Sequence, residues 1–317
     1  NACAVRMAIA EGYVYYVDGF SALQRIKICD WTTEIAIADQ SEIDSSIPST
    51  PAQLQAKPGA SLILNLRNRL YLSGFKDDPN FVQFSLIDGE GAKFDQFNEG
   101  FYSPDRSPAD SACSPVTALA RLDNNLVVFR EDGNSVFSAP TGLEFGKAQQ
   151  LDTFSWNIGV PNQEAVTEGN GQIYLWNRSE GFRRFAGTDS TFNSIAIDNE
   201  LRRIGSNNNV FMFAHANKVR MYFDRNNIGH ANHSFLYYTM LSGSSPWYMD
   251  DNTPAMWAIG DQNSDTIYAM HSQYPATFIV DEEEQFKDFD SSIKMEYSTP
   301  YKGPGDTLFT FTFKNDP

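Results

Sequence analysis

The sequence predicts an all-β fold, and three observations support this prediction. The surplus in the composition lies in Phe (24) and Tyr (14), with Asn, Asp, Ser and Gly, which is typical of strands and turns. A short unit recurs along the chain, in which turn residues precede an apolar or aromatic strand. Helical signals are few. The segment DEEEQFKDFDSS (Asp281–Ser292) could form a turn of helix, but it lacks a clear apolar stripe, so we expect a solvated loop there.

Six copies of the recurring unit can be recognised. They are EGYVYYV (Glu11–Val17), RNRLYLSG (Arg67–Gly74), DNNLVVFRE (Asp123–Glu131), GNGQIYLWN (Gly169–Asn177), SNNNVFMFA (Ser206–Ala214) and NTPAMWAIGD (Asn252–Asp261). We expect a short strand before each copy and a third strand after several of them. Asn-Asn, Asp-Gly and Gly-Asn-Gly at the joints favour tight hairpin turns. A fourth, outer strand is expected in places, as in TEIAIA and FLYYTML.

This repetition indicates a β-propeller, in which small sheets are arranged radially around a channel. We expect a single propeller over residues 1–317 with six blades, five and seven being the alternatives. The segment TLFTFTFKN alternates well. Residues from about 291 to 317 therefore either close the first blade or begin a further domain. The sequence has no run of 18 apolar residues, so no membrane-spanning helix is expected.

The charge of the chain argues against a nucleic-acid-reading protein. Its formal net charge is −16, from 40 acidic and 24 basic residues. Such a surface repels the phosphate backbone. A channel through which DNA slides without sticking remains compatible with this charge. The acidic run Asp281–Glu284 would either repel DNA from such a channel or form a solvated loop.

The three cysteines match no zinc-binding pattern. They are Cys3, Cys29 and Cys113. A Cys3–Cys29 bridge is one interpretation. Free, partly buried thiols are the interpretation we favour, because a chain of this length needs no disulfide to fold.

Two acidic loops could be taken for calcium sites. KDDPN places Asp77, Asp78 and Asn80 together, but a calcium loop needs alternating ligands, a Gly and a distal Glu. We expect a turn fixed by Pro and by side-chain hydrogen bonds instead. Asp132 and Gly133 are likewise expected to form a hairpin turn.

The four histidines do not form a recognisable metal motif. In HANH, His230 and His233 lie three residues apart, within a turn-rich stretch rather than a helix, and the other two are His215 and His271. We expect exposed loop imidazoles at HANH. A metal site there is the alternative.

No catalytic motif is found. The sequence has no Gly-x-Ser-x-Gly elbow, no P-loop, no dinucleotide fingerprint after a strand and no sialidase Asp-box. We predict that the protein is not an enzyme, and we assign no catalytic, cofactor or metal residue. Lectin propellers stack sugars on tryptophans, but we expect core packing for those in or beside the strand units, which are Trp156, Trp176, Trp247 and Trp257.

Several stretches resemble, in order, those of one family of phage proteins. NRLYLSGFKDDPNFVQFSLIDG is similar to an element in which an Arg-Leu-Tyr strand leads through an Asp-x-Pro-Asn loop to a V-x-F-S strand. Later stretches resemble the blades that follow. The matching stretches are Asn68–Gly89, Ala118–Ala139, Asn157–Gly187, Val219–Asp224 and Ser245–Asp251, within a region from Asn68 to about Asp290.

The family is the nozzle, or tail hub, of short-tailed bacteriophages, also called tail tubular protein B or packaged-DNA stabilisation protein. The resemblance implies a non-enzymatic virion protein that forms a ring, typically of six subunits, below portal and adaptor. The ring continues the DNA channel, helps to retain packaged DNA and carries tail fibres or spikes. This chain departs from the family in being short, since the usual platform and tail-tip domains are not evident.

Two other functions remain open from the sequence. The first is a carbohydrate-binding or carbohydrate-cleaving propeller that acts as a receptor-binding virion protein. The second is a secreted scaffold propeller, for which the glycosylation sequons at Asn177 and Asn232 are the relevant feature.

Overall fold

The structure of the chain is a computed structural model. The structure describes residues 5–30, 32–35, 55–88, 91–97, 100–102, 114–138, 149–155, 158–177, 179, 181–186, 190–192, 197, 201, 204, 210–224, 231, 233–239, 247–251, 255–260, 266–271, 277–280, 287–288, 291–292, 296–297 and 311–312.

Six small antiparallel sheets follow one another along the chain, and we call them blades 1 to 6. Blades 1 to 3 contain β1 (Arg6–Ala10), β2 (Tyr13–Val17), β3 (Gln24–Lys27) and β4 (Thr33–Ile35); β5 (Leu62–Leu66), β6 (Arg69–Ser73), β7 (Phe81–Asp88), β8 (Gly91–Phe97) and β9 (Phe101–Tyr102); and β10 (Val116–Leu122), β11 (Asn125–Arg130), β12 (Asn134–Ser138) and β13 (Gln149–Ser155).

Blades 4 to 6 continue the pattern. They contain β14 (Val166–Gly169), β15 (Gln172–Asn177), β16 (Gly181–Phe185) and β17 (Ser190–Phe192), preceded by the 3₁₀ helix η1 (Gln163–Ala165); β18 (Val210–His215), β19 (Lys218–Phe223), β20 (His233–Tyr238) and β21 (Trp247–Asp251); and β22 (Ala255–Gly260), β23 (Ile267–His271) and β24 (Thr277–Val280). Two short pairs follow, β25 (Lys287–Asp288) with β26 (Ser291–Ser292), and β27 (Glu296–Tyr297) with β28 (Phe311–Thr312).

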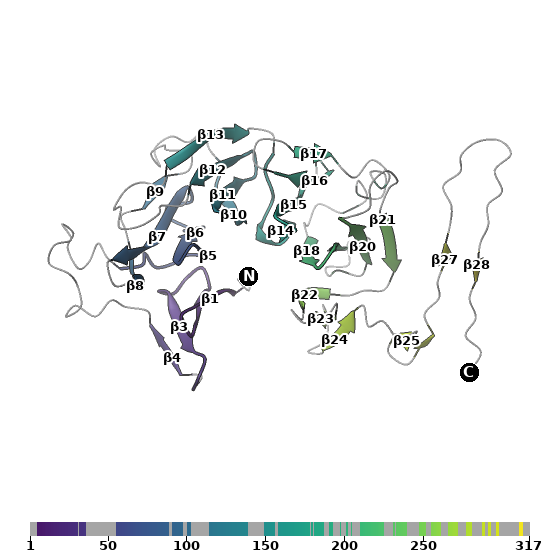
Figure 1. The fold of residues 1–317 in the computed structure, drawn as a ribbon, viewed down its shortest axis with the longest axis horizontal. Coiled ribbons are helices and arrows are strands. Elements are labelled where there is room, and N and C mark those ends of the chain that lie inside the picture. The colour runs from purple at the N-terminus through teal and green to yellow at the C-terminus, as the bar shows by residue number, and fades with distance from the viewer. Residues whose placement is uncertain are drawn as a thin grey trace.

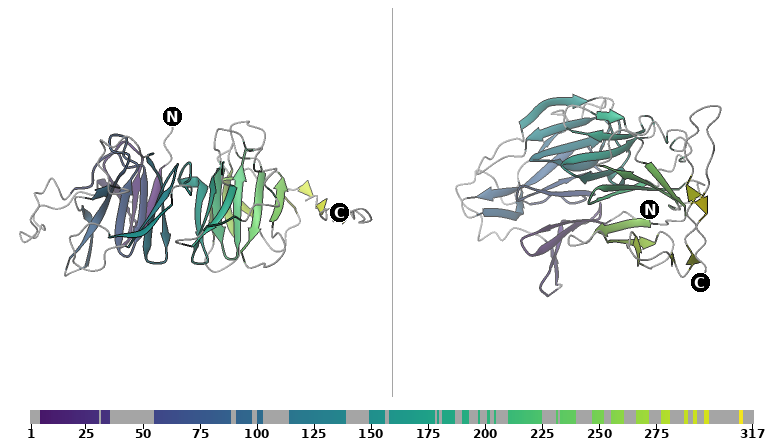
Figure 2. Two further views of the ribbon diagram at one scale, coloured as in Figure 1. Left: turned by 90° about the horizontal axis from the view of Figure 1, so that it is seen from above. Right: turned by 45° about the vertical axis from the view of Figure 1, so that its right-hand side comes forward.

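The blades are arranged radially. Figure 1 shows them as an arc around a common axis, with β1, β5, β10, β14, β18 and β22 innermost. Seen from above in Figure 2, the strands run across the thickness of the disc. Sequential small antiparallel sheets in radial order define a β-propeller, so the predicted fold class is confirmed. The described residues contain six such sheets of three to five strands.

The inner hairpins of blades 1 to 5 share one turn. Two residues connect the first strand to the second in each, as the pairing of Ala10 with Tyr13 shows for blade 1. The first turn residue has a positive φ in all five hairpins. These residues are Glu11, Arg67, Asp123, Asn170 and Ala216. Such two-residue turns match the twist of paired strands. The repeat therefore has a geometric basis in its tightest turn.

The hydrophobic core lies between blades rather than within one of them. One cluster joins blades 1 and 2, a second joins blades 2 and 3, a third spans blades 3 to 5, and a fourth joins blades 5 and 6. The second strand of a blade is covered on both faces. In β6, for example, Leu70, Tyr71 and Leu72 are all fully buried. Burial on both faces explains why these strands read as continuous apolar runs.

The assignment of the repeated unit is wrong in the last two blades. The unit contains the second strand in blades 1 to 4, as predicted. In blades 5 and 6, however, Ser206–Ala214 and Asn252–Asp261 contain the first strands, β18 and β22. The turn after β18 is Ala216-Asn217, which contains no Gly, although Ala216 adopts a φ of 49°. The expected turn signal is therefore missing at that point of the sequence.

Candidate functional site

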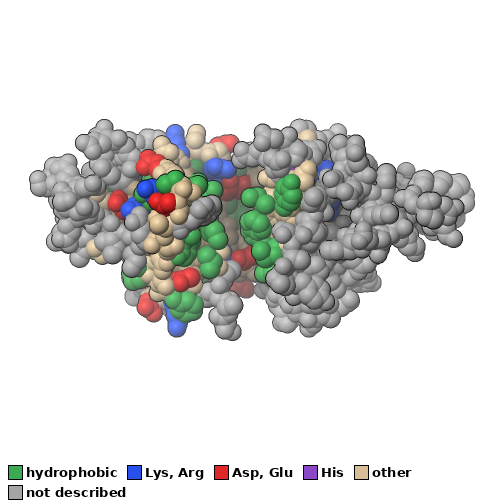
Figure 3. All heavy atoms as spheres, turned by 90° about the horizontal axis from the view of Figure 1, so that it is seen from below, with side chains coloured by type: hydrophobic (Ala, Val, Ile, Leu, Met, Phe, Trp, Pro, Cys, Tyr) green, Lys and Arg blue, Asp and Glu red, His purple; other side chains and the backbone are tan. Residues whose placement is uncertain are grey.

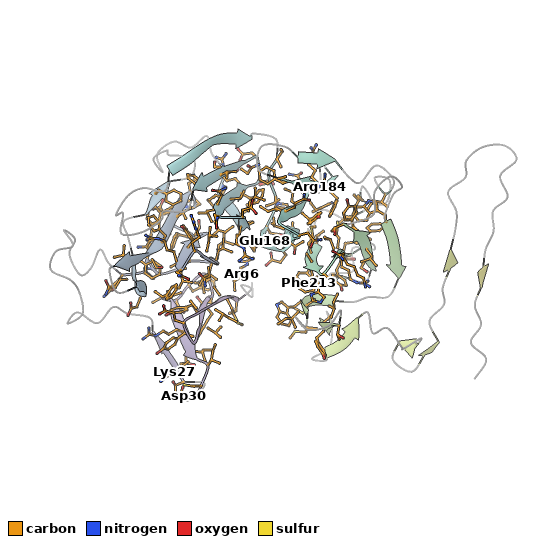
Figure 4. The ribbon with its side chains drawn as sticks, viewed as in Figure 1. Arg6, Lys27, Asp30, Glu168, Arg184 and Phe213 are labelled. Atoms are coloured by element: carbon orange, nitrogen blue, oxygen red, sulfur yellow. The ribbon has the colours of Figure 1, made fainter. Side chains whose placement is uncertain are left out.

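The axis of the propeller carries a set of polar contacts that tie blades together. The Arg6 guanidinium on β1 forms an ion pair with Glu164 of η1 at 2.5 Å and donates to the Ser61 carbonyl at 2.7 Å. Arg6 thereby links blade 1 to the start of blade 4, 158 residues away in sequence. Figure 4 shows Arg6 and Glu168 near the centre of the arc.

A second carboxylate lies on the inner strand of blade 4. Glu168 accepts hydrogen bonds from the backbone N–H and the side chain of Arg121 on β10, the latter at 3.1 Å. Burial raises the pKa of the Glu168 carboxyl, and the hydrogen bonds from Arg121 oppose that shift. The hydrogen bonds between Arg121 and Glu168 therefore connect blade 3 to blade 4.

Amide and hydroxyl side chains make similar links between inner strands. The Gln163 side chain accepts from the Leu119 N–H at 2.8 Å and donates to its carbonyl at 2.9 Å. The Asn65 amide donates to the Ile9 carbonyl at 2.7 Å, and Thr167 Oγ1 accepts from the Ala214 N–H at 3.0 Å. Side-chain hydrogen bonds thus connect blades 1 and 2, 3 and 4, and 4 and 5 at the axis.

An acidic residue of the KDDPN loop forms an ion pair with a lysine of the protein itself. Lys57 Nζ lies 2.8 Å from Asp78 Oδ2, which places a cation of the protein itself on this carboxylate. The same ammonium lies 5.2 Å from the Phe75 ring centroid and 5.1 Å from that of Phe81. The loop therefore fixes the connection between β6 and β7 through an ion pair held between two aromatic rings.

The other predicted acidic turn also has partners within the protein. Asp132 Oδ1 accepts a short hydrogen bond from the Ser114 hydroxyl, and the buried Arg130 guanidinium lies 3.7 Å from the same oxygen. Among the described residues, no group of three or more His, Cys, Asp or Glu side chains could hold a metal ion.

The structure separates the histidines and cysteines. His215 ends β18 and stacks on Phe213, with ring centroids 6.3 Å apart. His233 begins β20 and His271 ends β23. His230, Cys3 and Cys113 lie outside the described residues, as do Asp281–Glu284. Cys29 is a free thiol, as we favoured, but it is exposed rather than partly buried.

The tryptophans divide between core and surface. Trp176 is buried in the core of blades 3 to 5, and Trp247 packs edge-on against Phe182 at 4.7 Å, so core packing is confirmed for both. Trp257 corrects the prediction, because 47% of it is exposed. Trp156 lies outside the described residues.

The sequon at Asn177 is part of the folded blade. Its amide donates to the Gly159 carbonyl at 2.9 Å and its side-chain oxygen accepts from the Ser179 N–H at 2.9 Å. This side chain therefore has a structural role. Asn232 lies outside the described residues.

Sequence reasoning missed the contacts at the axis. Arg6, Arg121, Glu164 and Glu168 are ordinary charged residues in the sequence, and each partner lies in a different blade. No local pattern marks such pairs, since only the radial arrangement brings them together.

The chain is similar to several solved structures at low sequence identity. No protein-family model matches the sequence, and no curated protein matches it. The computationally designed Ika8 protein has a TM-score of 0.49 at 11% identity, covering 87% of this chain and 70% of that one. Hsv2 from Kluyvelomyces marxianus has a TM-score of 0.48 at 10% identity, covering 88% and 75%.

A third similar structure is much longer than this chain. It is the extracellular domain of the putative hybrid two component system BT3049 from B. thetaiotaomicron, with a TM-score of 0.49 at 11% identity. The match covers 93% of this chain but 34% of that domain, so this chain spans about a third of its length. In the described part of the chain, no helix has the length and apolar character needed to cross a membrane.

Proposed function

We propose that the chain is a structural component of a bacteriophage tail, a propeller module of its nozzle or hub. The observation that carries this proposal is the order of the stretches that resemble the nozzle family. They fall on consecutive blades, with Asn68–Gly89 on β6 and β7, Ala118–Ala139 on β10 to β12, and Asn157–Gly187 on β14 to β16. A chance resemblance need not respect blade boundaries, whereas a shared architecture would.

The contacts of the charged side chains support a structural role. Arg6 with Glu164 and Arg121 with Glu168 connect different blades, and Lys57 with Asp78 fixes a loop. Contacts of this kind hold the blades of a propeller in fixed positions relative to one another. Stiffness is the property that a ring holding pressurised DNA requires.

The charge of the chain is consistent with DNA passage without adhesion. A net charge of −16 repels phosphates, so a duplex gains no counterion-release energy by binding. The proposed partners are further copies of this chain in a ring of six, the portal and adaptor proteins, and tail fibres or spikes of the same virion.

The proposal is tested by the mass of the native assembly. Light scattering on the purified chain and on material from its source should give a ring of about six copies, or co-purification with portal and adaptor proteins. A short duplex should show no binding at 50 mM salt, where any electrostatic attraction would be strongest. A monomer that associates with no virion protein would contradict the proposal.

One observation favours the second function, carbohydrate binding. The side chains of Trp257 and Tyr268 are 47% and 42% exposed, and exposed rings can stack on sugars. A glycan array with Trp257→Ala beside the exposed control Phe20→Ala tests it. Binding that is lost only with Trp257→Ala would support this function.

A further inference from the structure

Exposed apolar side chains gather on the first and last blades. Among the described residues, ten large hydrophobic side chains are more than a third exposed, and all ten belong to blade 1 with its connections or to blade 6. Blades 2 to 5 have none in their described part. Exposed apolar surface that is concentrated in this way marks a contact site.

On blade 1, one face of the sheet is left uncovered. Along β1, Ala8 and Ala10 are buried against blade 2, whereas Met7 and Ile9, which alternate with them, are 64% and 66% exposed. Alternate residues of a strand point to opposite faces of the sheet. Met7 and Ile9 therefore lie on the face that points away from blade 2.

This face, which we call wall 1, is apolar and uncharged across three strands. Met7 pairs with Tyr16 on β2, and Ile9 pairs with Val14, which pairs in turn with Ile26 on β3. The charged residues of β1 and β3 occupy the alternate positions, which belong to the opposite face; they are Arg6, Arg25 and Lys27. Packing against wall 1 therefore takes no charged group of these strands out of water.

Blade 6 has an equivalent face, which we call wall 6. On the side that packs against blade 5, Ala258 is buried. On the opposite side, Ile259 pairs with Tyr268, and Trp257 pairs with Met270. These four side chains are between 41% and 51% exposed, and none of them is charged.

The two walls border one opening. Figure 1 shows that the arc of blades is interrupted between blade 1 and blade 6. Figure 3 shows hydrophobic side chains on both sides of this opening. Every other pair of successive blades shares a hydrophobic cluster, and among the described residues no such cluster joins blade 6 to blade 1.

The junction between blades 2 and 3 shows that two faces of this kind pack directly on each other. Leu62 and Leu66 on β5 share a cluster with Val116 and Leu119 on β10, and each of the four is at most 5% exposed. Large apolar side chains on both first strands therefore bury each other with no further sheet between them. Propellers close with about four to eight blades, so six sheets are enough for a ring.

We propose that wall 1 and wall 6 pack against each other, so that the six blades close into a ring at this seam and the open arc is the other of two states. Removal of both apolar faces from water drives the closure. The movement can be shared among the five junctions between successive blades. The seam is the one junction whose two blades are not consecutive in the sequence, which makes it the place at which this ring opens.

A photo-crosslinking experiment on the full chain tests the proposal. p-Benzoylphenylalanine is placed at Ile9 in one variant and at Tyr268 in another, and crosslinked peptides are identified by mass spectrometry at two protein concentrations. Ile9 should crosslink to peptides of β22 and β23, and Tyr268 to peptides of β1 and β2. Both yields should be independent of concentration, because the contact forms within one chain. Phe20, which is 68% exposed between β2 and β3, is the control position and should give no such product.

A substitution on the opposite wall shows whether the crosslink reports apolar packing. Ile259→Asp places a carboxylate on wall 6 and should lower the yield from Ile9 about fivefold, because closure would bury that charge. Phe20→Asp adds the same charge outside both walls and should leave the yield unchanged. Urea unfolding of both variants checks that the blades stay folded, since both positions are exposed in the open arc.

Three outcomes would overturn the proposal. Crosslinks from Ile9 and Tyr268 to another segment of the same chain would mean that this segment fills the opening. A covalent dimer whose yield rises with protein concentration would mean that a second copy covers the walls. Yields at Ile9 and Tyr268 no higher than at Phe20 would mean that the walls stay apart.

Discussion

Phe182 on β16 offers the sharpest test of how the blades are held together. Its side chain is fully buried, and its ring lies 6.0 Å from Tyr174 in the same blade, 5.3 Å from Tyr237 and 4.7 Å from Trp247, both in blade 5. Burial of a Phe is worth about 3–5 kcal/mol against Ala. The measured cost of a Phe→Ala substitution already includes the lost ring contacts, and Phe182 makes three of them. We therefore expect Phe182→Ala to lower the free energy of unfolding by about 4–5 kcal/mol, in the upper part of that range.

Urea unfolding followed by tryptophan fluorescence measures this loss, with the unfolding free energy extrapolated to water. Phe182→Leu keeps most of the volume but removes the ring, so its loss should be smaller, about 1.5 kcal/mol. Phe20→Ala is the exposed control and should change stability by less than about 0.5 kcal/mol. A loss below about 1 kcal/mol for Phe182→Ala would refute the assignment of blade-to-blade packing as the main source of stability.

Three further predictions concern other buried groups. Trp176→Ala should cost about 3–5 kcal/mol in urea unfolding, because its side chain is buried in the same core. Lys57→Met leaves the mostly buried Asp78 carboxylate without its cation and should cost about 1–3 kcal/mol, and adding Asp78→Asn should recover at least half of that loss in a double-mutant cycle. Burial raises the pKa of Tyr71 to about 12, so its ionisation should be missing from an absorbance titration at 295 nm until well above pH 10. Since the unfolded chain releases this proton first, the contribution of Tyr71 is intact below pH 10 and falls by about 2–3 kcal/mol by pH 12, whereas Tyr71→Phe should lack this loss.

The sequence predicted the blades wherever their inner turns carried an explicit signal. Glu11-Gly12 and Asn170-Gly171 are turn pairs with a Gly, and both adopt the positive φ values that such a turn requires. Ala216 adopts the same geometry without any residue preference for it, because the strand pairing around it imposes the turn. The prediction therefore located the strands, but in blades 5 and 6 it took the first strand of the blade for the second.

The contacts at the axis could not be predicted from the sequence. Arg6 and Glu164 belong to blades that become neighbours across the centre only after the sheets have assembled. The exposure of Trp257 was likewise unpredictable, because β22 (AMWAIG) is a continuous apolar run, like the strands that are covered on both faces. What covers a face depends on the neighbouring blade, and one strand does not specify its neighbour.

The separation of Arg6 and Glu164 along the chain has a consequence for folding kinetics. Each blade is built from hairpins between adjacent strands, so most pairing closes short loops and is fast. The ion pair at the axis instead closes a loop of 158 residues, and its entropy cost is recovered only once three blades are in place. Substitution of Glu164 should therefore speed unfolding and leave the folding rate almost unchanged, with a φ-value near zero. We thus expect the contact between Arg6 and Glu164 to form late in folding and to break early in unfolding.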